Sequence, residues 1–414
     1  MRAGVRVVAA LVLAAPGRLA AQADSMPHEP TSYQITVVTS DTGAHLLGEV
    51  ETGWRLRNVE PVVMQLDSTM RVIRVLVDGK PNTRLSRTMY ARSGTEVVVP
   101  HEKAPGDTLT TRVRYHGIPA GGFRVGPDRA GARALAGETA GNLARLWLPV
   151  PAGEPGRAAV TWSVQASVDQ RVAANGVLVK VDTLSYGHTT WQFRQDAPIP
   201  TDAFAAAGGH YAVTTLPRAG CTKCEPVTLW TTPADSVAAA ASPAFRRAGE
   251  MVDWLSGLVG PLPYAGLAHV ASILPPAGHP GAGVVLWDEG RIHDGSIVER
   301  EVAEATAAQW FGNAVSESGP ETGRPSPAVA AYLAYLWTRR DARGRSTEAL
   351  TGPVAAIQGL NRTVGDSAFF RGLRRYLESN RNSTAPAGAF EQAMSEAAGR
   401  KLDWTFARAA GTGR

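Results

Sequence analysis

Cysteine is scarce in this sequence, and long apolar runs are absent from it. The chain has 414 residues and only two cysteines, Cys221 and Cys224, which excludes a disulfide-dense scaffold. No stretch reaches the ~18 consecutive apolar residues of a membrane-spanning helix, so no transmembrane segment is expected. With 44% hydrophobic and 19% charged residues, the chain is long and apolar enough for two packed domains.

Basic clusters interleaved with aromatic residues are also missing. The formal net charge is +5, but Arg2, Arg6 and Arg18 supply three of the positive charges and all lie within the first 23 residues. The rest of the chain is therefore nearly neutral. A nucleic-acid partner is not expected, because such proteins concentrate positive charge on one surface.

The first 23 residues predict a secretory signal peptide. They combine a basic start, a short apolar stretch at residues 7–15 and the cleavage pattern Ala21-Gln22-Ala23. A retained N-terminal anchor is the alternative. We expect an exported protein, periplasmic or extracellular. An oxidising compartment favours a disulfide between Cys221 and Cys224, whereas zinc binding by this pair is not expected because no second Cys or His pair follows at ligand spacing.

Hydrophobic periodicity divides the remaining chain in two. From residue 33 to residue 215, segments such as YQITVVT, RVIRVLVDGK and AAVTWSVQAS alternate apolar and polar residues, which predicts an all-β sandwich over residues 24–220. From about residue 243 the period becomes helical, which predicts a mainly helical domain over residues 221–414. A capping box of Ser296 and Glu299 is expected to start one of these helices.

Histidine is missing where a familiar motif would place it. Residues 299–315 read EREVAEATAAQWFGNAV. A β-sandwich followed by a helical domain that carries QWFGN resembles the M1 aminopeptidase family, the aminopeptidase N-like gluzincin metallopeptidases. NLARLWLPVPAGEPGRAAVTWSV and VGDSAFFRGLRRYLESN are similar to further family segments, so the resemblance runs from Tyr33 to Gly411. It implies a saddle-like first domain and a thermolysin-like second one, here without the large C-terminal helical domain.

The resemblance also implies a zinc site, whose residues are replaced. The family motif is H-E-x-x-H-x18-E, in which two His and the last Glu hold zinc and the first Glu is the general base. With QWFGN as the anchor, the two His positions are Glu304 and Ala308, the base position is Ala305 and the last Glu position is Pro327. A single carboxylate does not hold zinc against water, so we expect no zinc and no other cofactor.

Two other family motifs are altered as well. The G-x-M-E-N stretch, whose Glu holds the free amine of the substrate in the family, corresponds to Gly281, Ala282, Gly283 and Val284, so that Val284 replaces the Glu. These four positions are expected to be a vestigial substrate site. The family's catalytic Tyr corresponds to a position near Leu350.

Three functions follow as hypotheses. The first is a catalytically inactive pseudopeptidase that binds a peptide or protein in the inherited cleft. The second is an active exported zinc aminopeptidase that uses non-standard ligands, for example Glu304 with Glu301 or His293. The third is a structural or assembly protein that works through a surface patch. Glu304 is expected to be solvated or hydrogen-bonded and Trp310 to lie in the core, because such residues at helical spacing are usually structural.

Overall fold

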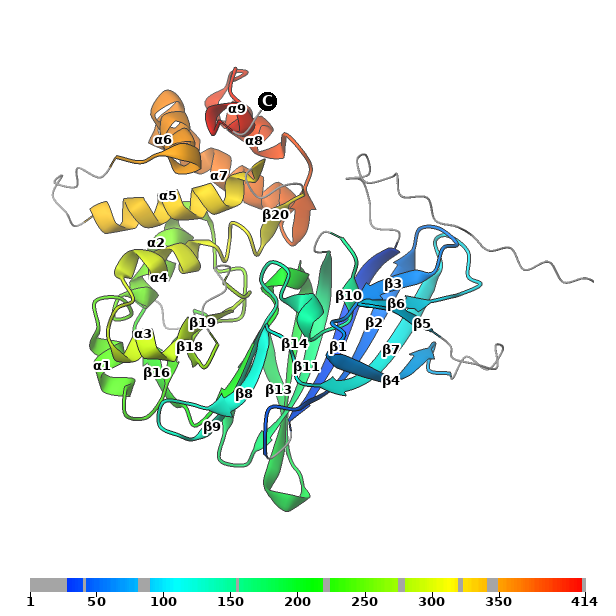
Figure 1. Ribbon diagram of the computed structural model, residues 1–414. Helices are drawn as coiled ribbons and strands as arrows, with labels where there is room; N and C mark the ends of the chain where they lie inside the picture. The colour runs from blue at the N-terminus through cyan, green and yellow to red at the C-terminus, as the bar shows by residue number, and fades with distance from the viewer. Residues whose placement is uncertain are drawn as a thin grey trace, which may run out of the picture.

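The computed structural model describes residues 28–39, 42–80, 90–153, 156–218, 224–274, 280–318, 323–340 and 349–411. These residues form an N-terminal unit of β-sheets beside a C-terminal unit in which helices dominate (Figure 1). The predicted fold class, an all-β part followed by a mainly helical part, is confirmed. None of the described helices is long and apolar enough to cross a membrane.

The largest sheet has seven strands, in the order β13 (Val177–Thr183), β14 (His188–Pro200), β11 (Arg157–Ser167), β1 (His28–Thr39), β2 (Leu46–Leu56), β7 (Thr108–Gly117) and β4 (Met70–Val77). The central strand β1 is antiparallel to β2 and parallel to β11. Buried and less buried side chains alternate along β2 and β11, which confirms the period of two in the sequence. Trp54 and Trp162 are fully buried in the core that this face covers.

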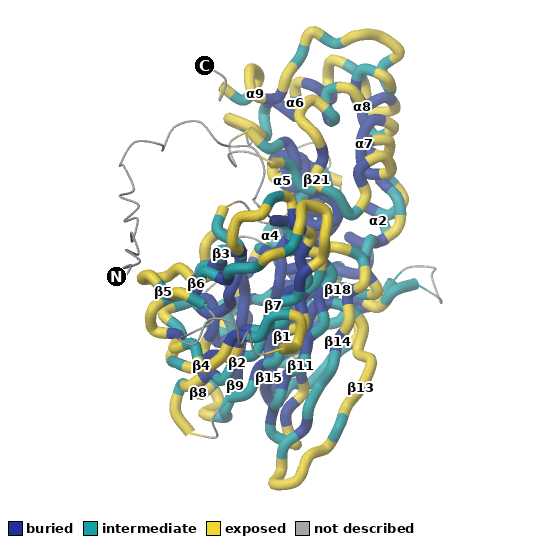
Figure 2. The backbone as a smooth tube through the Cα atoms, turned by 90° about the vertical axis from the view of Figure 1, so that its right-hand side faces the viewer, coloured by how far each residue is buried: buried dark blue, intermediate teal, exposed yellow. Residues whose placement is uncertain are grey.

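Two smaller sheets complete the N-terminal unit. One has the order β10 (Val150–Pro151), β3 (Val62–Gln65), β6 (Glu96–Val99) and β5 (Ala91–Ser93). The other has the order β12 (Arg171–Ala174), β15 (Ala205–Gly209), β9 (Arg133–Glu138) and β8 (Phe123–Pro127). Figure 2 shows that buried residues fill the middle of both units, whereas strand β13 is largely exposed.

The C-terminal unit contains a sheet that the period analysis did not predict. Its order is β16 (Ala212–Leu216), β17 (Val227–Thr231), β18 (Leu267–Ser272) and β19 (Val284–Asp288), and a two-stranded sheet joins β20 (Val315–Glu317) to β21 (Ser383–Ala385). The helices are α1 (Ser236–Ala241), α2 (Ala248–Val259), α3 (Glu289–His293), α4 (Glu299–Ala307), α5 (Pro325–Arg339), α6 (Gly352–Val364), α7 (Asp366–Asn380), α8 (Ala389–Ala398) and α9 (Phe406–Ala409). Strand β16 precedes residue 220 but pairs with β17, so it is hydrogen-bonded into the second unit.

The start of helix α4 differs from the prediction. The expected capping box of Ser296 and Glu299 is wrong, because the helix begins at Glu299 and the Glu301 carboxylate accepts a hydrogen bond from the Val298 N–H at 2.9 Å. Glu301 is held there by Arg291, whose Nη2 lies 2.8 Å from its Oε2. A carboxylate two residues downstream thus takes the capping role, as Glu at N3 commonly does.

Candidate functional site

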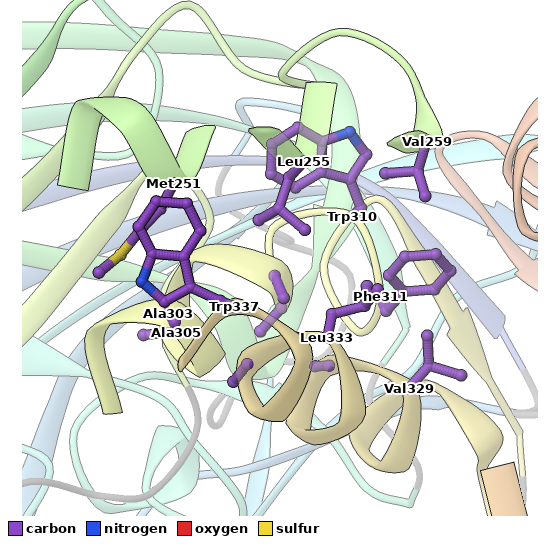
Figure 3. Close-up of a cluster of buried hydrophobic side chains, with 14 of the residues drawn as sticks. Met251, Leu255, Val259, Ala303, Ala305, Trp310, Phe311, Val329, Leu333 and Trp337 are labelled. Carbon is purple, nitrogen blue, oxygen red and sulfur yellow. The ribbon is translucent and has the colours of Figure 1, made fainter. Parts of the chain in front are cut away.

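Four residues occupy the positions that the resemblance assigns to the zinc motif, here called the zinc-frame positions: Glu304, Ala305, Ala308 and Pro327. Glu304 and Ala305 lie on helix α4, Ala308 directly follows it, and Pro327 lies in the first turn of helix α5; the two helices pack against each other. Figure 3 shows Ala303 and Ala305 of α4 among apolar side chains from α2 and α5, with Trp310 in the same cluster. Trp310 is 3% exposed, so its predicted place in the core is confirmed. Helix α4 is thus anchored in the core by its apolar face.

The residues at the zinc-frame positions do not fit a zinc ion. Glu304 is exposed, and its carboxyl is one potential ligand. Ala305 and Ala308 are buried, Pro327 is exposed in the first turn of α5, and none of these three side chains has a donor atom. Zinc sites in proteins use three or four Cys, His, Asp or Glu ligands. Within the described residues, no group of three or more such side chains is placed to hold a metal.

Glu304 sits in a partly desolvated position despite its exposure. Desolvation raises the pKa of its carboxyl, and the nearby positive charge of Arg300 opposes this effect. A carboxyl with a raised pKa takes up a proton more readily, which makes it a poorer metal ligand. The exposure of its side chain agrees with the expectation that Glu304 is solvated or hydrogen-bonded.

Residues 280–283, which overlap the expected vestigial substrate site at 281–284, are held against the end of helix α4 by two buried amides. Gln309 Oε1 accepts a hydrogen bond from the Gly283 N–H at 2.8 Å, and Gln309 Nε2 donates to Gly281 O at 3.2 Å. Asn313 Nδ2 donates to Pro280 O at 3.0 Å. Both amide side chains are fully buried. The Gln and Asn of QWFGN therefore fix the backbone of residues 280–283 through hydrogen bonds.

The other side of this segment faces the β-sheet unit. The Ala282 N–H donates to Ala203 O at 3.0 Å, and Ala282 O accepts from Asn175 Nδ2 at 2.8 Å. A Cβ on Gly281 would lie 2.5 Å from Val284 O and 2.7 Å from the Ala205 Cβ, which explains the glycine. Val284, at the start of β19, is 3% exposed. All these groups are packed, and a binding role for them stays a prediction.

Glu138 is a buried acidic residue at the junction where the β-sheet unit meets the C-terminal unit, and the sequence analysis missed it. It ends strand β9, where Ala134 and Ala136 share its face of the sheet and pack in one cluster with Val284. Its direct neighbour on β15 is Ala205, the residue that Gly281 approaches. Glu138 is 8% exposed, and burial raises the pKa of its carboxyl from 4.5 to about 7.

No hydrogen bond or ion pair to the Glu138 carboxyl is present among the described residues. A buried carboxylate without a nearby cation is costly, which is why burial favours its protonated form. In the sequence, GETAG between two apolar segments gave no sign of this burial, since only the pairing of β9 with β15 places Glu138 beside Ala205, the residue that Gly281 approaches.

Arg157 joins the two units close to this junction. Its guanidinium donates to Asn313 O at 2.7 Å, to Ala314 O at 3.2 Å and to the Ser316 hydroxyl at 2.9 Å, all in the segment that follows α4. A further hydrogen bond reaches Pro198 O on β14 at 2.9 Å. Desolvation lowers the pKa of Arg157 to about 10, so the side chain remains charged at neutral pH.

A half-buried carboxyl, Glu317 at the end of β20, lies beside the start of helix α5. Glu317 Oε1 accepts a hydrogen bond from the Ser326 hydroxyl at 2.6 Å and one from the Tyr376 hydroxyl at 2.5 Å. Desolvation raises the pKa of Glu317. These contacts join β20, α5 and α7 next to Pro327, and they fix the helix end where the family would place its last zinc ligand.

The remaining predicted residues lie outside this site. Leu350 precedes α6 and packs against the core of the C-terminal unit. The His293 Nδ1 lies 2.8 Å from the Asp235 Oδ1, so His293 contacts Asp235 and not Glu304. Cys221 lies outside the described residues, so the disulfide with Cys224 stays a prediction.

Two hollows on the described surface do not involve helix α4. One, of about 40 Å³, lies in the β-sheet unit, where Thr139, Asn142 and Asp202 contribute to its wall. It has room for about one water molecule. The other, of about 440 Å³, lies between α2 and α7, beside Phe370 and Arg374. Neither hollow is lined by the residues at the zinc-frame positions.

No protein-family model and no curated protein matches the chain. Solved structures do. An M1 zinc metallopeptidase from Deinococcus radiodurans superposes with a TM-score of 0.70 at 21% identity, over 90% of each chain. A mutant of the M1 zinc metallopeptidase from that organism, bound to a Tyr-Ser-Ala substrate, superposes with a TM-score of 0.70 at 21% sequence identity, over 93% of each chain. A two-domain M1 zinc metallopeptidase mutant bound to L-tryptophan superposes with a TM-score of 0.70 at 20% sequence identity, over 94% of each chain. The chain thus has the two-domain fold of these enzymes.

Proposed function

We propose that this protein is an exported M1 peptidase-like protein that binds a peptide or protein at the junction of its two units and does not hydrolyse it. The observation that carries the proposal is the frame of helices α4 and α5, which keeps its packing while Ala305, Ala308 and Pro327 offer no ligand and no general base. Losing a general base and two or three ligands removes both the means to hold zinc and the means to activate water.

Glu138 supports a binding role for the junction. Val284 stands where the fold's peptidases would carry an acidic residue for a free amine, and the Glu138 carboxyl lies on the neighbouring β-sheet without a cation. A protonated amino terminus or a basic side chain of the partner would supply that cation. Such a charge-assisted hydrogen bond is strong in a desolvated site. We therefore propose that the partner presents a positively charged group to Glu138.

The first test is the zinc content of the purified mature protein after zinc loading and dialysis, together with an aminopeptidase assay. Near-zero zinc and no hydrolysis are expected. One zinc per chain, with hydrolysis that chelation removes and zinc restores, would contradict the proposal and favour the alternative of an active exported metallopeptidase with non-standard ligands.

The second test measures peptide binding by calorimetry. A peptide library first identifies a ligand, and its free and N-acetylated forms are then compared on wild type, Glu138→Gln and the exposed control Glu378→Gln. Acetylation and Glu138→Gln should each weaken binding about tenfold, which corresponds to about 1.4 kcal/mol. Their effects should not add, because both remove the same interaction. Equal affinity of all three proteins for both forms would exclude Glu138 as the anchor.

A further inference from the structure

Strand β13 forms an exposed apolar edge of the seven-stranded sheet. It pairs with β14 on one side, and no strand of the described chain pairs with its other side. Its side chains are unusually open for a strand of valine and leucine: Val177 is 42% exposed, Leu178 48%, Val179 47% and Val181 44%. Figure 2 shows the exposure along the whole strand. An edge of this kind is a template for pairing with another chain.

The hydrogen-bonding phase of this edge follows from the pairing with β14. The Leu184 N–H donates to His188 O at 2.7 Å, and Thr183 lies opposite Thr189. In an antiparallel pair, alternate residues turn their N–H and C=O toward the partner. Leu184 and Asp182 therefore bond to β14, whereas Val181 and Thr183 direct their backbone groups to the open side.

The charges on β13 complement each other across a two-fold axis. Lys180 and Asp182 lie on one face of the strand, on either side of Val181, and form an ion pair within the chain at 2.8 Å. If two copies of β13 pair antiparallel with Val181 opposite itself, Lys180 of each copy lies opposite Asp182 of the other. The same register joins the outward backbone groups of the two Val181 residues.

Other registers of the same phase are disfavoured. A slip of two residues in one direction places Lys180 opposite Lys180, and a slip in the other places Asp182 opposite Asp182. Like charges directly opposite each other destabilise a strand pair. A lysine on an edge strand, together with a bulge such as the one between Leu178 and Lys180, often keeps edges apart. Here the lysine has an acidic partner in the register centred on Val181.

We propose that two copies of this chain associate through antiparallel β13 strands, with the two-fold axis at Val181, so that their seven-stranded sheets become one continuous sheet. The interface is isologous, as in most homodimers, because each copy contributes the same residues. It leaves the junction of the two units free, and it is independent of the proposed peptide binding.

Charge reversal tests both the dimer and its register. By sedimentation, the wild type should be a dimer. Lys180→Asp gives a strand with two acids, and Asp182→Lys gives one with two bases, so each variant alone should dimerise about tenfold more weakly or worse. An equal mixture of the two variants should restore dimers, which also shows that both are folded. A wild type that stays monomeric up to about 100 µM, or variants that dimerise alone as well as when mixed, would overturn the proposal.

A cysteine at the axis tests the register independently. In the proposed pair, the two Val181 Cα atoms are about 5.5 Å apart, within the range that a disulfide spans. Two Val179 residues are offset by four positions, or about 13 Å, which is beyond that range. Val181→Cys should therefore form a covalent dimer on mild oxidation, whereas the matched control Val179→Cys should not. Equal cross-linking of the two variants would exclude this register.

Discussion

The buried Gln309 amide offers the sharpest test of how the junction is held together. Gln309→Leu keeps approximately the size and shape of the side chain and removes its polar atoms. It leaves the Gly283 N–H and the Gly281 carbonyl without their partner at a site where Gln309 itself is 0% exposed. It also removes the acceptor that Asn313 Nδ2 reaches at 3.4 Å.

The expected cost follows from the groups that lose their partner. A buried donor or acceptor left unsatisfied costs about 1–3 kcal/mol. Gly281 O and Gly283 N are two such groups, and the added apolar atoms of leucine recover a part of the loss through burial. We expect a net destabilisation of about 3 kcal/mol, concentrated in residues 280–284 rather than spread over the chain.

Hydrogen exchange measures this local effect directly. The Gly283 amide should exchange about a hundredfold faster in Gln309→Leu, which corresponds to about 3 kcal/mol of lost protection. The matched control is Gln392→Leu, on the exposed face of α8, which should stay within about 0.5 kcal/mol of wild type. If the Gly283 amide exchanges at the wild-type rate in Gln309→Leu, the amide does not hold this segment and the reasoning is refuted.

Three further predictions concern the polar groups of Glu138, Arg157 and Glu317. The pKa of Glu138 rises from 4.5 to about 7 on folding, so the folded state keeps this proton at higher pH, and the free energy of unfolding should fall by up to about 3 kcal/mol between pH 4.5 and 7. Urea unfolding at several pH values should show this fall for the wild type and not for Glu138→Gln. Identical pH profiles of the two proteins would contradict the prediction. Arg157→Met should lower the free energy of unfolding by about 2–4 kcal/mol in the same assay, since four acceptors lose their donor. An unchanged urea midpoint of unfolding would show that water replaces the guanidinium. Tyr376→Phe should lower the free energy of unfolding by about 1–2 kcal/mol and raise the pKa of Glu317 further, because it removes a hydrogen bond to that carboxylate. A lower pKa of Glu317 in the variant, measured by NMR titration, would contradict this.

Much of the fold was predictable because the signals were local. The alternation in β2 and β11 is visible within ten or so residues, and it translated directly into one buried face per strand. The resemblance places Ala305, Ala308 and Pro327 at the zinc-motif positions, and it is the side-chain chemistry of these residues, which have no ligand atoms in any conformation, that predicts the absence of zinc. Trp310 was placed in the core on helical spacing alone.

What the sequence did not reveal depends on residues far apart in the chain. The sheet of β16 to β19 consists of strands of five or six residues separated by helices and loops, too short for a clear period. Glu138 gains its surroundings only when β9 pairs with β15, and Arg157 gains its acceptors only when the two units meet. The wrong prediction of the cap of α4 has a similar cause, because Arg291 holds the Glu301 carboxylate at the Val298 N–H and the sequence pattern does not show this ion pair.

The parallel pair of β1 and β11 has a consequence for how the chain folds. Ser32 pairs with Ala159, so one side of the central strand finds its partner more than 100 residues later in the chain. Until then, β1 with β2 is an open sheet whose unpaired edge runs through apolar residues such as Ile35 and Val37. Such non-local pairing slows folding and exposes a segment prone to aggregation. We therefore expect a truncated chain that ends before β11 to remain unfolded, and refolding of the full chain to depend on a late step that closes this sheet.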